Sequence, residues 1–437
     1  MAGSGPACAS GDASPLLERG DLPPEVVCSP PGPRTLELAA DLGRVEAPGI
    51  NTLHAGRTRM VLAEALGSNL LDVDGNRYVD LTAGFGVAAI GHRHPAVIEA
   101  VAQQAARLVH GLGDVHAHPA RISAARELCD LAPFENARVY WAISGADAIE
   151  IALKTALLHT GSTELVAFEP GYHGVTLGAL RATSRPAFRQ PFDAPLEAHT
   201  SRFPFGGPLR EVARRLASSP KVGACVVEPV VGREGILLPP DGWLAELAEI
   251  CRHHAALLIA DEVFTGLART GFRWACDAEG VRPDLLCCGK ALGGGMPIAA
   301  VLGRREVLDA WSSPDEARHT ATFVAHPLAC AAASTVLAIL ERDRLAERAA
   351  QLGAWLGERL RSIAGSHALR GRGLAWALVA RDRDQAARWA GTLLDRGYLA
   401  LAGGPKGSVL QIAPPLIITG EQLEGAVTAI AEVIGGA

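Results

Sequence analysis

The sequence predicts an α/β protein with a mostly parallel central sheet in a large domain and a smaller α+β domain. The first observation behind this prediction is a series of short, continuous apolar runs from residue 138 onward, separated by glycine turns and helical stretches. Continuous runs are typical of strands covered on both faces, as in a parallel sheet. The second is size and composition: 437 residues, 49% hydrophobic and 20% charged, suffice for a large globular domain with a smaller one attached.

Composition excludes several classes of protein. The net charge is -6, with 41 basic and 47 acidic residues, so there is no basic excess for nucleic acid. No apolar run of about 18 residues predicts a membrane span. The nine cysteines show no metal or disulfide spacing, and no signal peptide is recognisable. We therefore expect a cytoplasmic protein without a metal site.

Four regions follow one another along the chain. Residues 1–35 are rich in Pro, Gly, Ala and Ser and are expected to form a flexible N-terminal arm. Residues 36–90 are expected to pack with the small domain, and 69–81 within them reads as a hairpin with a tight turn at 74–76. Residues 91–344 form the predicted large, cofactor-binding domain. Residues 345–437 form the C-terminal small domain.

The elements of these domains are placed by apolar runs and by proline and glycine signals. Pro95 opens a helix expected to reach Leu108. Another helix is expected from Asp147 to about His159. In the small domain we expect an amphipathic helix over 342–361, a turn at 370–373 and a helix from about Gly420. Strands are expected at 138–143, 165–168, 224–227, 257–260, 285–288 and 298–302, and residues 409–419 are expected to form a strand followed by a loop.

Lys290 is the residue around which the site is predicted. The apolar run 285–288 leads directly to Gly289 and Lys290, and three glycines then precede a second apolar run. Desolvation of an ammonium at the edge of an apolar sheet should lower its pKa and make the neutral amine available as a nucleophile. The alternative interpretation is a surface lysine in a glycine-rich turn.

Asp261 supplies a carboxylate to the same predicted edge of the sheet. It follows an apolar strand, and ligands bind at the carboxyl ends of strands in such folds. It precedes Lys290 by 29 residues, about one crossover unit. A lysine and a carboxylate in one cleft suit pyridoxal phosphate, because the lysine binds its aldehyde and the carboxylate keeps its ring nitrogen protonated. The alternative role for Asp261 is that of a helix N-cap.

Two further segments fit the same cofactor. Gly145 and Ala146 lie in a turn at the start of a helix, where backbone N–H groups can bind a phosphate. Tyr172 and His173 form an aromatic pair on a loop that leaves a strand, able to stack on the cofactor ring. Core packing explains either aromatic residue equally well when it is taken alone.

The order of these motifs resembles the class III aminotransferases. The resemblance extends from about Asn69 to Thr419 with matching order and spacing. The segments that carry it are Ser144-Gly145-Ala146-Asp147, Gly171-Tyr172-His173-Gly174, Glu228-Pro229, Asp261-Glu262-Val263-Phe264-Thr265-Gly266, Lys290 with its glycines, His319 to Phe323, and His326-Pro327.

The resemblance implies the fold type I architecture and a homodimer with shared active sites. It makes Lys290 both the cofactor anchor and the proton carrier, and it places Asp261 at the ring nitrogen. Thr322 would reach the phosphate of the neighbouring subunit. The other implied cofactor-binding residues are Gly145 and Ala146 at the phosphate, Tyr172 on the ring, Val263 beneath it, and His173 and Glu228.

Departures from the family pattern concern the substrate. Members that act on 4-aminobutyrate or ornithine usually carry arginines where this chain has Val175 and Gln411. Arg233, in turn, stands where many of those enzymes have a second glutamate. We expect Arg233 and Gln411 to contact the substrate, with Arg233 replacing the missing carboxylate clamp. The alternative is that Arg233 points to solvent or pairs with Glu234.

The sequence therefore predicts a pyridoxal-phosphate-dependent aminotransferase that moves an amino group from an amine or amino acid to a 2-oxo acid. An amino-acid racemase, epimerase or aminomutase would share every cofactor residue and stays open as an alternative. A non-catalytic binding protein of the same fold is a further alternative, which the joint presence of Lys290 and Asp261 disfavours.

Overall fold

The computed structural model describes residues 17–50, 59–192, 199–219, 221–313 and 316–435. The chain divides into two compact units, unit 1 with Met1–His94 and Leu352–Ala437, and unit 2 with Pro95–Gln351. The sequence had placed the limits of the large domain at 91 and 344, and the functional roles of the two domains stay a prediction. Among the described residues, no helix has the length and apolar character needed to cross a membrane.

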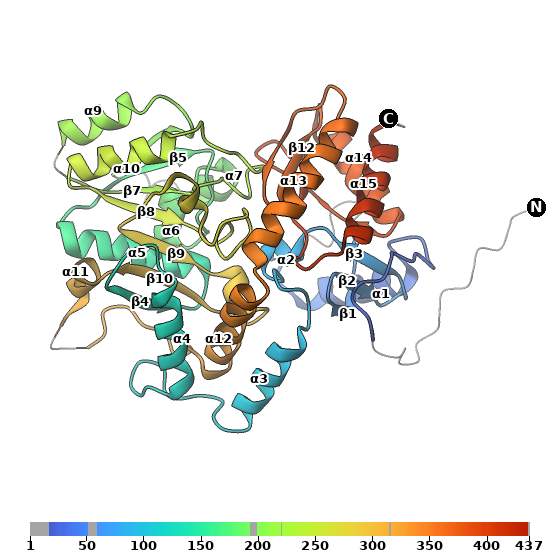
Figure 1. Cartoon of the computed structure of the whole chain (residues 1–437), viewed down its shortest axis with the longest axis horizontal. Helices are drawn as coiled ribbons and strands as arrows, with labels where there is room; N and C mark the ends of the chain where they lie inside the picture. The colour runs from blue at the N-terminus through green and yellow to red at the C-terminus, as the bar shows by residue number, and fades with distance from the viewer. Residues whose placement is uncertain (1–16, 51–58, 193–198, 220, 314–315, 436–437) are drawn as a thin grey trace, which may run out of the picture. The chain divides into compact units, whose positions relative to one another are not determined.

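Unit 2 is built on a seven-stranded sheet in its described part (Figure 1). Strands β5 to β9 run parallel, while β10 is antiparallel to both of its neighbours, β4 and β9. This arrangement confirms the predicted mostly parallel sheet. In spatial order the strands are β4 (Ala137–Ala142), β10 (Ala299–Arg304), β9 (Leu285–Cys288), β8 (Leu257–Asp261), β7 (Val222–Val227), β5 (Glu164–Glu169) and β6 (Thr200–Pro204).

The central strands of this sheet form where the continuous apolar runs predicted them. Every residue of β7, β8 and β9 is buried, which explains why these strands contain no polar alternation. Strand β6 was not predicted, because its residues are mostly polar and half-buried at the edge of the sheet. The central strands end in line, so the residues after them share one edge.

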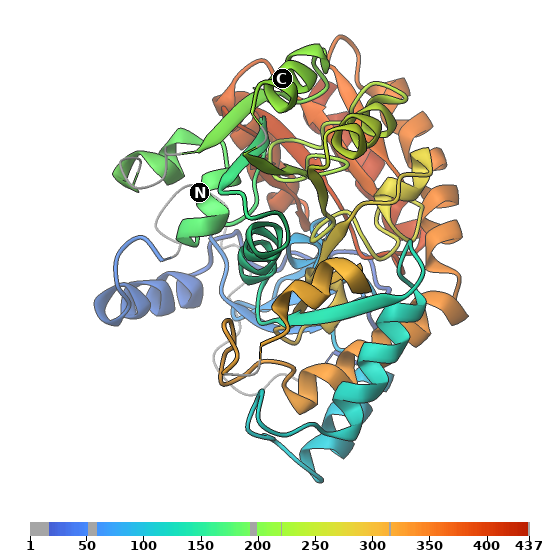
Figure 2. The same ribbon diagram turned by 90° about the vertical axis from the view of Figure 1, so that its left-hand side faces the viewer.

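Helix α5 (Gly145–Thr160) packs along the sheet against β4, β10, β9, β8 and β7, and Figure 2 shows it nearly end-on. It begins two residues earlier than predicted, because Ser144 caps its first turn. Helix α3 ends at Ala105 instead of Leu108. The other helices of unit 2 are α3 (Pro95–Ala105), α4 (Pro119–Asp130), α6 (Leu177–Ala182), α7 (Pro186–Arg189), α9 (Arg210–Ser218), α10 (Trp243–His253), α11 (Arg305–Leu308) and α12 (Pro327–Arg342).

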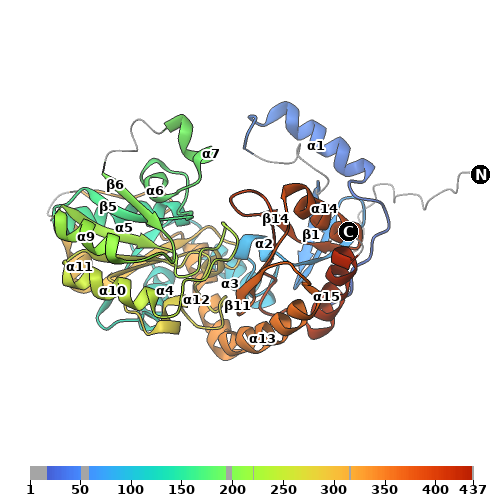
Figure 3. The same cartoon turned by 90° about the horizontal axis from the view of Figure 1, so that it is seen from above.

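Unit 1 contains two four-stranded sheets in its described part (Figure 3). One has the order β1 (Leu62–Leu66), β2 (Asn69–Asp72), β3 (Arg77–Asp80) and β13 (Tyr398–Leu399), so both ends of the chain contribute to it. The other has the order β11 (Leu369–Arg372), β12 (Ala375–Val379), β15 (Val409–Ile412) and β14 (Leu401–Gly403). The helices are α1 (Pro33–Val45), α2 (Ala83–Gly86), α14 (Arg383–Asp395) and α15 (Gly420–Gly435), and α13 (Leu345–Ile363) continues into this unit from unit 2.

Unit 1 confirms the hairpin predicted over 69–81. Strands β2 and β3 pair antiparallel, and Asp72 closes the turn by accepting hydrogen bonds from the N–H groups of Asp74 and Asn76, both at 2.9 Å. The turn predicted at 370–373 is shifted: Leu369–Arg372 is strand β11, paired with β12, and the turn between the two strands falls at Gly373 and Leu374. The glycine at 371 suggested a turn, but it also permits the close packing of the Trp376 ring against its backbone.

Residues 17–35 differ from the flexible arm that was expected. Glu25 bridges Arg77, the N–H groups of Val27 and Cys28 donate to the Asn76 side chain, and helix α1 begins at Pro33. Cys28 is disulfide-bonded, which the cysteine spacing did not predict. Residues 1–16, the first part of the expected arm, lie outside the described residues.

Candidate active site

Lys290 follows β9 directly and opens the short 3-10 helix η3 (Lys290–Gly293) with a φ of 42°. Its half-buried amine lies 5.2 Å from the centroid of the Phe264 ring. Burial lowers the pKa of this amine, and the positive charges of Arg233 and Arg269 lower it further. The carboxylates of Asp261 and Glu228 oppose this effect without reversing it. Lys290 is therefore poised as the nucleophile that the sequence predicted.

Asp261 ends β8, opposite Cys287 of the neighbouring β9, so its expected position at the carboxyl end of a strand is confirmed. The side chain is buried, and one of its oxygens, Oδ2, lies 2.7 Å from Nδ1 of His173. The other, Oδ1, accepts a hydrogen bond from the N–H of Val263 at 3.1 Å. A buried carboxylate at this edge can hold a positive charge on a ligand next to it.

His173 lies on the loop after β5, where its own N–H donates to Thr183 Oγ1 at 2.9 Å. Burial opposes protonation of the ring, but the hydrogen bond to Asp261 and the charges of Asp261 and Glu228 outweigh it and raise the pKa of His173. The imidazole thus braces Asp261 by donating from Nδ1. The side chain contacts the carboxylate and was expected to stack on the cofactor instead.

Glu228 follows β7 and fastens two loops of the site. Its Oε1 accepts from the N–H of Tyr172 and its Oε2 from the N–H of Gly232, both at 2.9 Å. Burial raises the pKa of Glu228 to about 7, and the charge of Asp261 adds to this while His173 counters it. Glu228 therefore holds the backbones of Tyr172 and Gly232 in position. It also interacts electrostatically with the two other buried groups, His173 and Asp261.

The start of α5 contains the turn for which phosphate binding was predicted. The Ser144 hydroxyl accepts from the N–H of Asp147 at 3.2 Å. Within the described residues, the N–H groups of Gly145 and Ala146 have no acceptor from the chain. A Cβ on Gly145 would lie 2.7 Å from Cγ1 of Val263, so only glycine allows this approach. Two open donors at a helix N-terminus suit a phosphate.

The residues present therefore fit pyridoxal phosphate. A lysine with a lowered pKa, a buried carboxylate and a turn with two open N–H donors come from three neighbouring elements, η3, β8 and α5. Val263 contacts the turn at Gly145 and approaches Gly289, the residue before Lys290. The structure thus brings most of the predicted cofactor residues to one edge of the sheet.

Arg233 lies in the loop after β7, on the wall of the site that carries Tyr172. Its guanidinium carbon is 4.7 Å from the centroid of the Tyr172 ring and 5.2 Å from that of Phe188. The expected alternative partner, Glu234, is buried and pairs with Arg185 at 2.7 Å. Sequence reasoning missed Phe188, because it lies on the four-residue helix α7, too short to show a period.

Three residues named from the sequence remain, of which Thr322 and Gln411 were predicted to bind ligands and Val175 was a departure from the family pattern. Thr322 is exposed on the segment before α12, and its carbonyl accepts a hydrogen bond from His110 Nε2 at 2.8 Å. Val175 is 55% exposed. Gln411 belongs to β15 of unit 1, where it pairs with Ala377 and Leu401. The proposed substrate role of Gln411 stays a prediction.

The sheet, the lysine after β9 and the carboxylate at the end of β8 define a pyridoxal-phosphate-dependent enzyme of fold type I. The family model described as Aminotransferase class-III matches residues 52–434. The chain belongs to the class III aminotransferase family, and it is an enzyme that uses pyridoxal phosphate.

Several known proteins are similar to this chain. An acetylornithine aminotransferase from Methanopyrus kandleri is 39% identical over 380 residues, which cover 86% of this chain and 95% of the relative. The crystal structure of the ornithine aminotransferase from Toxoplasma gondii has a TM-score of 0.85 at 31% identity and covers 92% of this chain and 95% of its own. An amine transaminase from an uncultivated Pseudomonas species has a TM-score of 0.82 at 28% identity, covering 90% and 97%.

These findings confirm amino-group transfer from an amine or amino acid to a 2-oxo acid. They do not favour the racemase, epimerase or aminomutase alternatives, or the non-catalytic one, since the relatives are named as aminotransferases.

Proposed function

We propose that this aminotransferase takes its amino group from a donor that carries a carboxylate, and that Arg233 binds this carboxylate. The observation that carries the proposal is the position of Arg233 over the Tyr172 ring, within the electrostatic reach of the Lys290 amine. A guanidinium stacked on aromatic rings loses little further side-chain freedom when it binds, and it matches a carboxylate in a bidentate way. The relatives named acetylornithine and ornithine aminotransferase support such a donor.

Lys290 carries the central chemical role in this proposal. When bound, pyridoxal phosphate supplies an aldehyde that takes up the amino group and a protonated ring that withdraws electrons from the reacting carbon. Lys290 Nζ holds that aldehyde covalently between turnovers. Once the amino group of the donor had displaced it, the Lys290 amine would be placed to accept the proton from the reacting carbon of the donor and to give it up again later in the transfer. The lowered pKa of Lys290 favours the neutral amine that this step requires.

The remaining residues of the site would bind and orient the cofactor. The Asp261 carboxylate keeps the ring nitrogen protonated, and His173 fixes its rotamer through Oδ2. The N–H groups of Gly145 and Ala146 would bind the phosphate, and Val263 would pack against the ring. The Tyr172 ring, which has Arg233 over one face, would stack on the cofactor ring. Glu228 holds the backbone of Tyr172 in place for this contact.

Assembly is the next part of the proposal: we infer a homodimer in which Thr322 serves the active site of the neighbouring subunit. Thr322 lies next to an exposed apolar surface, since Phe323 is 62%, Leu112 59% and Val115 69% exposed. The backbones of Gly113 and Thr322 are close enough that a Cβ on the glycine would lie 2.9 Å from the Thr322 oxygen. A second copy of the chain is the occupant that the family resemblance favours for this surface. Active protein that sediments as a monomer would contradict it.

We further infer that the enzyme works in the cytoplasm on small molecules, without nucleic acid or membrane partners. The net charge of -6 gives no electrostatic attraction to nucleic acid. In this proposal unit 2 binds the cofactor, and Gln411 contacts the substrate.

A screen of amine donors against several 2-oxo acids tests the donor class. We expect mass spectrometry to show conversion of the 2-oxo acid into its amino acid with donors that carry a carboxylate. A neutral amine is the second candidate, because exposed Val175 and uncharged Gln411 replace two arginines of related enzymes. Faster turnover of neutral amines than of every carboxylated donor would overturn the proposal. Chiral analysis of each donor, run in parallel, separates transfer from racemisation.

A further inference from the structure

We propose that His319 is a positioning residue for the phosphate-binding turn at the start of α5. It lies between the 3-10 helix η4 (Asp309–Trp311) and α12, with 16% of its side chain exposed. Its Nε2 is 2.9 Å from Oδ1 of Asp147, and its Nδ1 is 2.9 Å from Nζ of Lys154. The inference rests on the proposed role of Gly145 and Ala146 in binding the cofactor phosphate.

The chemistry of the three side chains fixes the direction of these hydrogen bonds. An ammonium can only donate, so Nδ1 of His319 accepts from Lys154. Nε2 therefore carries the proton and donates it to the Asp147 carboxylate. The result is a chain of donors that points from Lys154 through the imidazole to Asp147.

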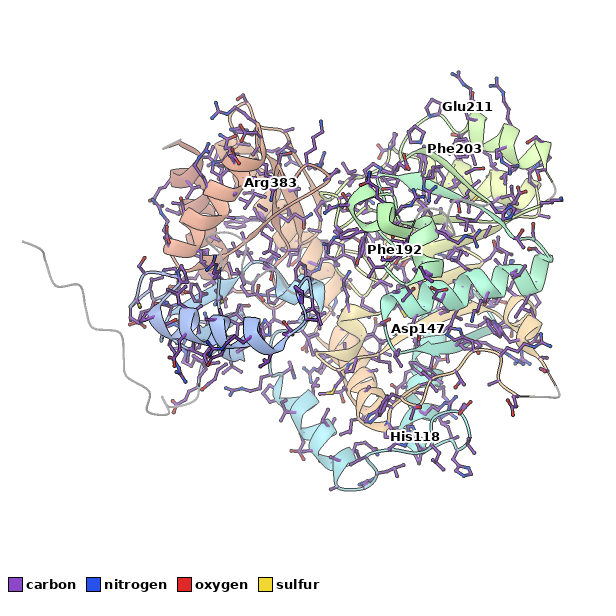
Figure 4. All side chains as sticks on the ribbon, turned by 180° about the vertical axis from the view of Figure 1, so that it is seen from behind. His118, Asp147, Phe192, Phe203, Glu211 and Arg383 are labelled. Atoms are coloured by element: carbon purple, nitrogen blue, oxygen red, sulfur yellow. The ribbon has the colours of Figure 1, made fainter. Side chains whose placement is uncertain are left out.

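Asp147 in turn shapes the phosphate-binding turn. Its second oxygen, Oδ2, accepts from the N–H of Ile143 at 2.9 Å, and its own N–H donates to Ser144 Oγ at 3.2 Å. These two bonds close the segment 143–147, and Gly145 and Ala146 lie between them. Figure 4 labels Asp147 on α5. Because His319 holds Oδ1, the carboxylate cannot rotate toward the open N–H groups and compete with a phosphate for them.

The hydrogen-bonded series Lys154, His319 and Asp147 also affects the electrostatics of the turn. A carboxylate in the first turn of a helix is stabilised by the helix dipole, but it repels an anion bound at that turn. The hydrogen bond from His319, backed by the positive charge of Lys154, draws the negative charge of Asp147 away from the turn. The turn can then hold both the structural aspartate and a phosphate.

His319 is itself anchored to the body of unit 2. Its carbonyl accepts from the Tyr140 hydroxyl at 2.6 Å, and the Tyr140 ring lies edge-on at 6.4 Å between centroids. The Trp311 ring lies at 6.3 Å, and its Nε1 donates to Thr155 Oγ1 of α5 at 2.8 Å. The imidazole is therefore held by β4 and α5, and substituting it should change the turn more than the fold.

Cofactor binding to wild-type apoenzyme and to His319→Ala, measured with pyridoxal phosphate and with pyridoxal, tests the proposal. Pyridoxal lacks the phosphate but keeps the aldehyde and ring, so the ratio of the two affinities reports the turn alone. We expect His319→Ala to weaken pyridoxal phosphate by about 10- to 100-fold, as for loss of a charged hydrogen bond. Binding of pyridoxal should change less than about twofold.

Three further variants sharpen the test. His319→Gln should restore the affinity for pyridoxal phosphate, because its amide can accept from Lys154 and donate to Asp147. Asp147→Asn should show a smaller selective loss than His319→Ala, because its amide oxygen cannot replace both carboxylate oxygens as acceptors for Ile143 and His319, but the charge that repels the phosphate is also removed. His159→Ala, at an exposed histidine in the last turn of α5, is the matched control and should leave both affinities unchanged.

Equal losses for pyridoxal phosphate and pyridoxal, or no loss for either, would overturn the proposal and leave His319 a role in folding alone. The melting temperature of the apoenzyme, measured for each variant, checks that role directly. The outcome is independent of the donor class, because a preference for neutral amines in the donor screen would refute the Arg233 proposal and leave these affinities unaffected.

Discussion

The two walls of the active site differ in how their residues are held. On the cofactor wall, Asp261, His173 and Glu228 are 5%, 4% and 6% exposed and bind one another or the backbone. On the substrate wall, Arg233 is exposed and rests on the faces of two aromatic rings, and Val175 is 55% exposed. Buried charged groups need partners, whereas exposed ones can change at little cost to the fold. The residues of the cofactor wall are thus constrained by their partners, whereas those of the substrate wall can be replaced without disturbing the fold.

The largest effect is expected on the cofactor wall, from Lys290→Ala. Without its amine the enzyme loses both the covalent attachment and the proton carrier, so turnover should fall by several orders of magnitude. Borohydride trapping of the wild-type enzyme followed by peptide mapping should find the cofactor on Lys290. Label on another lysine would remove this assignment, and Lys221→Ala, at an exposed lysine, serves as the control.

Asp261→Asn should be the next most severe change and should affect all donors equally. The variant keeps the shape of the side chain but loses the charge that supports the protonated ring, so kcat should fall about 10²- to 10³-fold while some cofactor stays bound. Steady-state kinetics with two unlike donors measures this. Near wild-type turnover in a folded variant would show that Asp261 does not have this role.

Arg233→Gln, on the substrate wall, should have an effect that depends on the donor, in contrast to Asp261→Asn. For a carboxylated donor we expect a loss of about 2–5 kcal/mol in transition-state binding, read from kcat/KM. A neutral amine should be almost unaffected. Equal losses for both donors, or none, would show that Arg233 does not bind the carboxylate. Arg210→Gln, with a side chain 73% exposed on α9, is the control.

The smallest effect concerns the pH dependence of stability on the cofactor wall. Because the folded-state pKa of His173 is raised, its charge stabilises the fold below the unfolded pKa of about 6.5, and this contribution is lost as pH rises through the folded value. Compared with His173→Gln, the wild-type apoenzyme should gain about 1 kcal/mol at low pH. Denaturant unfolding at several pH values measures this, and a difference that grows with pH would have the wrong sign.

The same contrast explains what the sequence could predict. The positions of Asp261 and Lys290 at neighbouring strand ends were predicted correctly, because continuous apolar runs mark the buried strands and the carboxyl ends of parallel strands share one edge. The bond between His173 and Asp261 joins residues 88 apart in the sequence, and no local pattern specifies such a pair. Phe188 was missed because helix α7 has only four residues. The turn predicted at 370–373 falls at 373–374 instead, because Gly371 lies in strand β11 with the Trp376 ring against it and Gly373 takes the left-handed conformation of the turn.

Val263 packs against two glycines, Gly145 and Gly289, and both positions leave little room for a side chain. A methyl group on Gly145 would come within 2.7 Å of its Cγ1, and one on Gly289 within 3.5 Å of the same atom. This one methyl group of Val263 therefore sets the distance between the turn assigned to the phosphate and the residue before Lys290. This spacing is therefore set by packing within the protein itself. A larger residue at 145 would change the dimension of the site without touching any group that reacts.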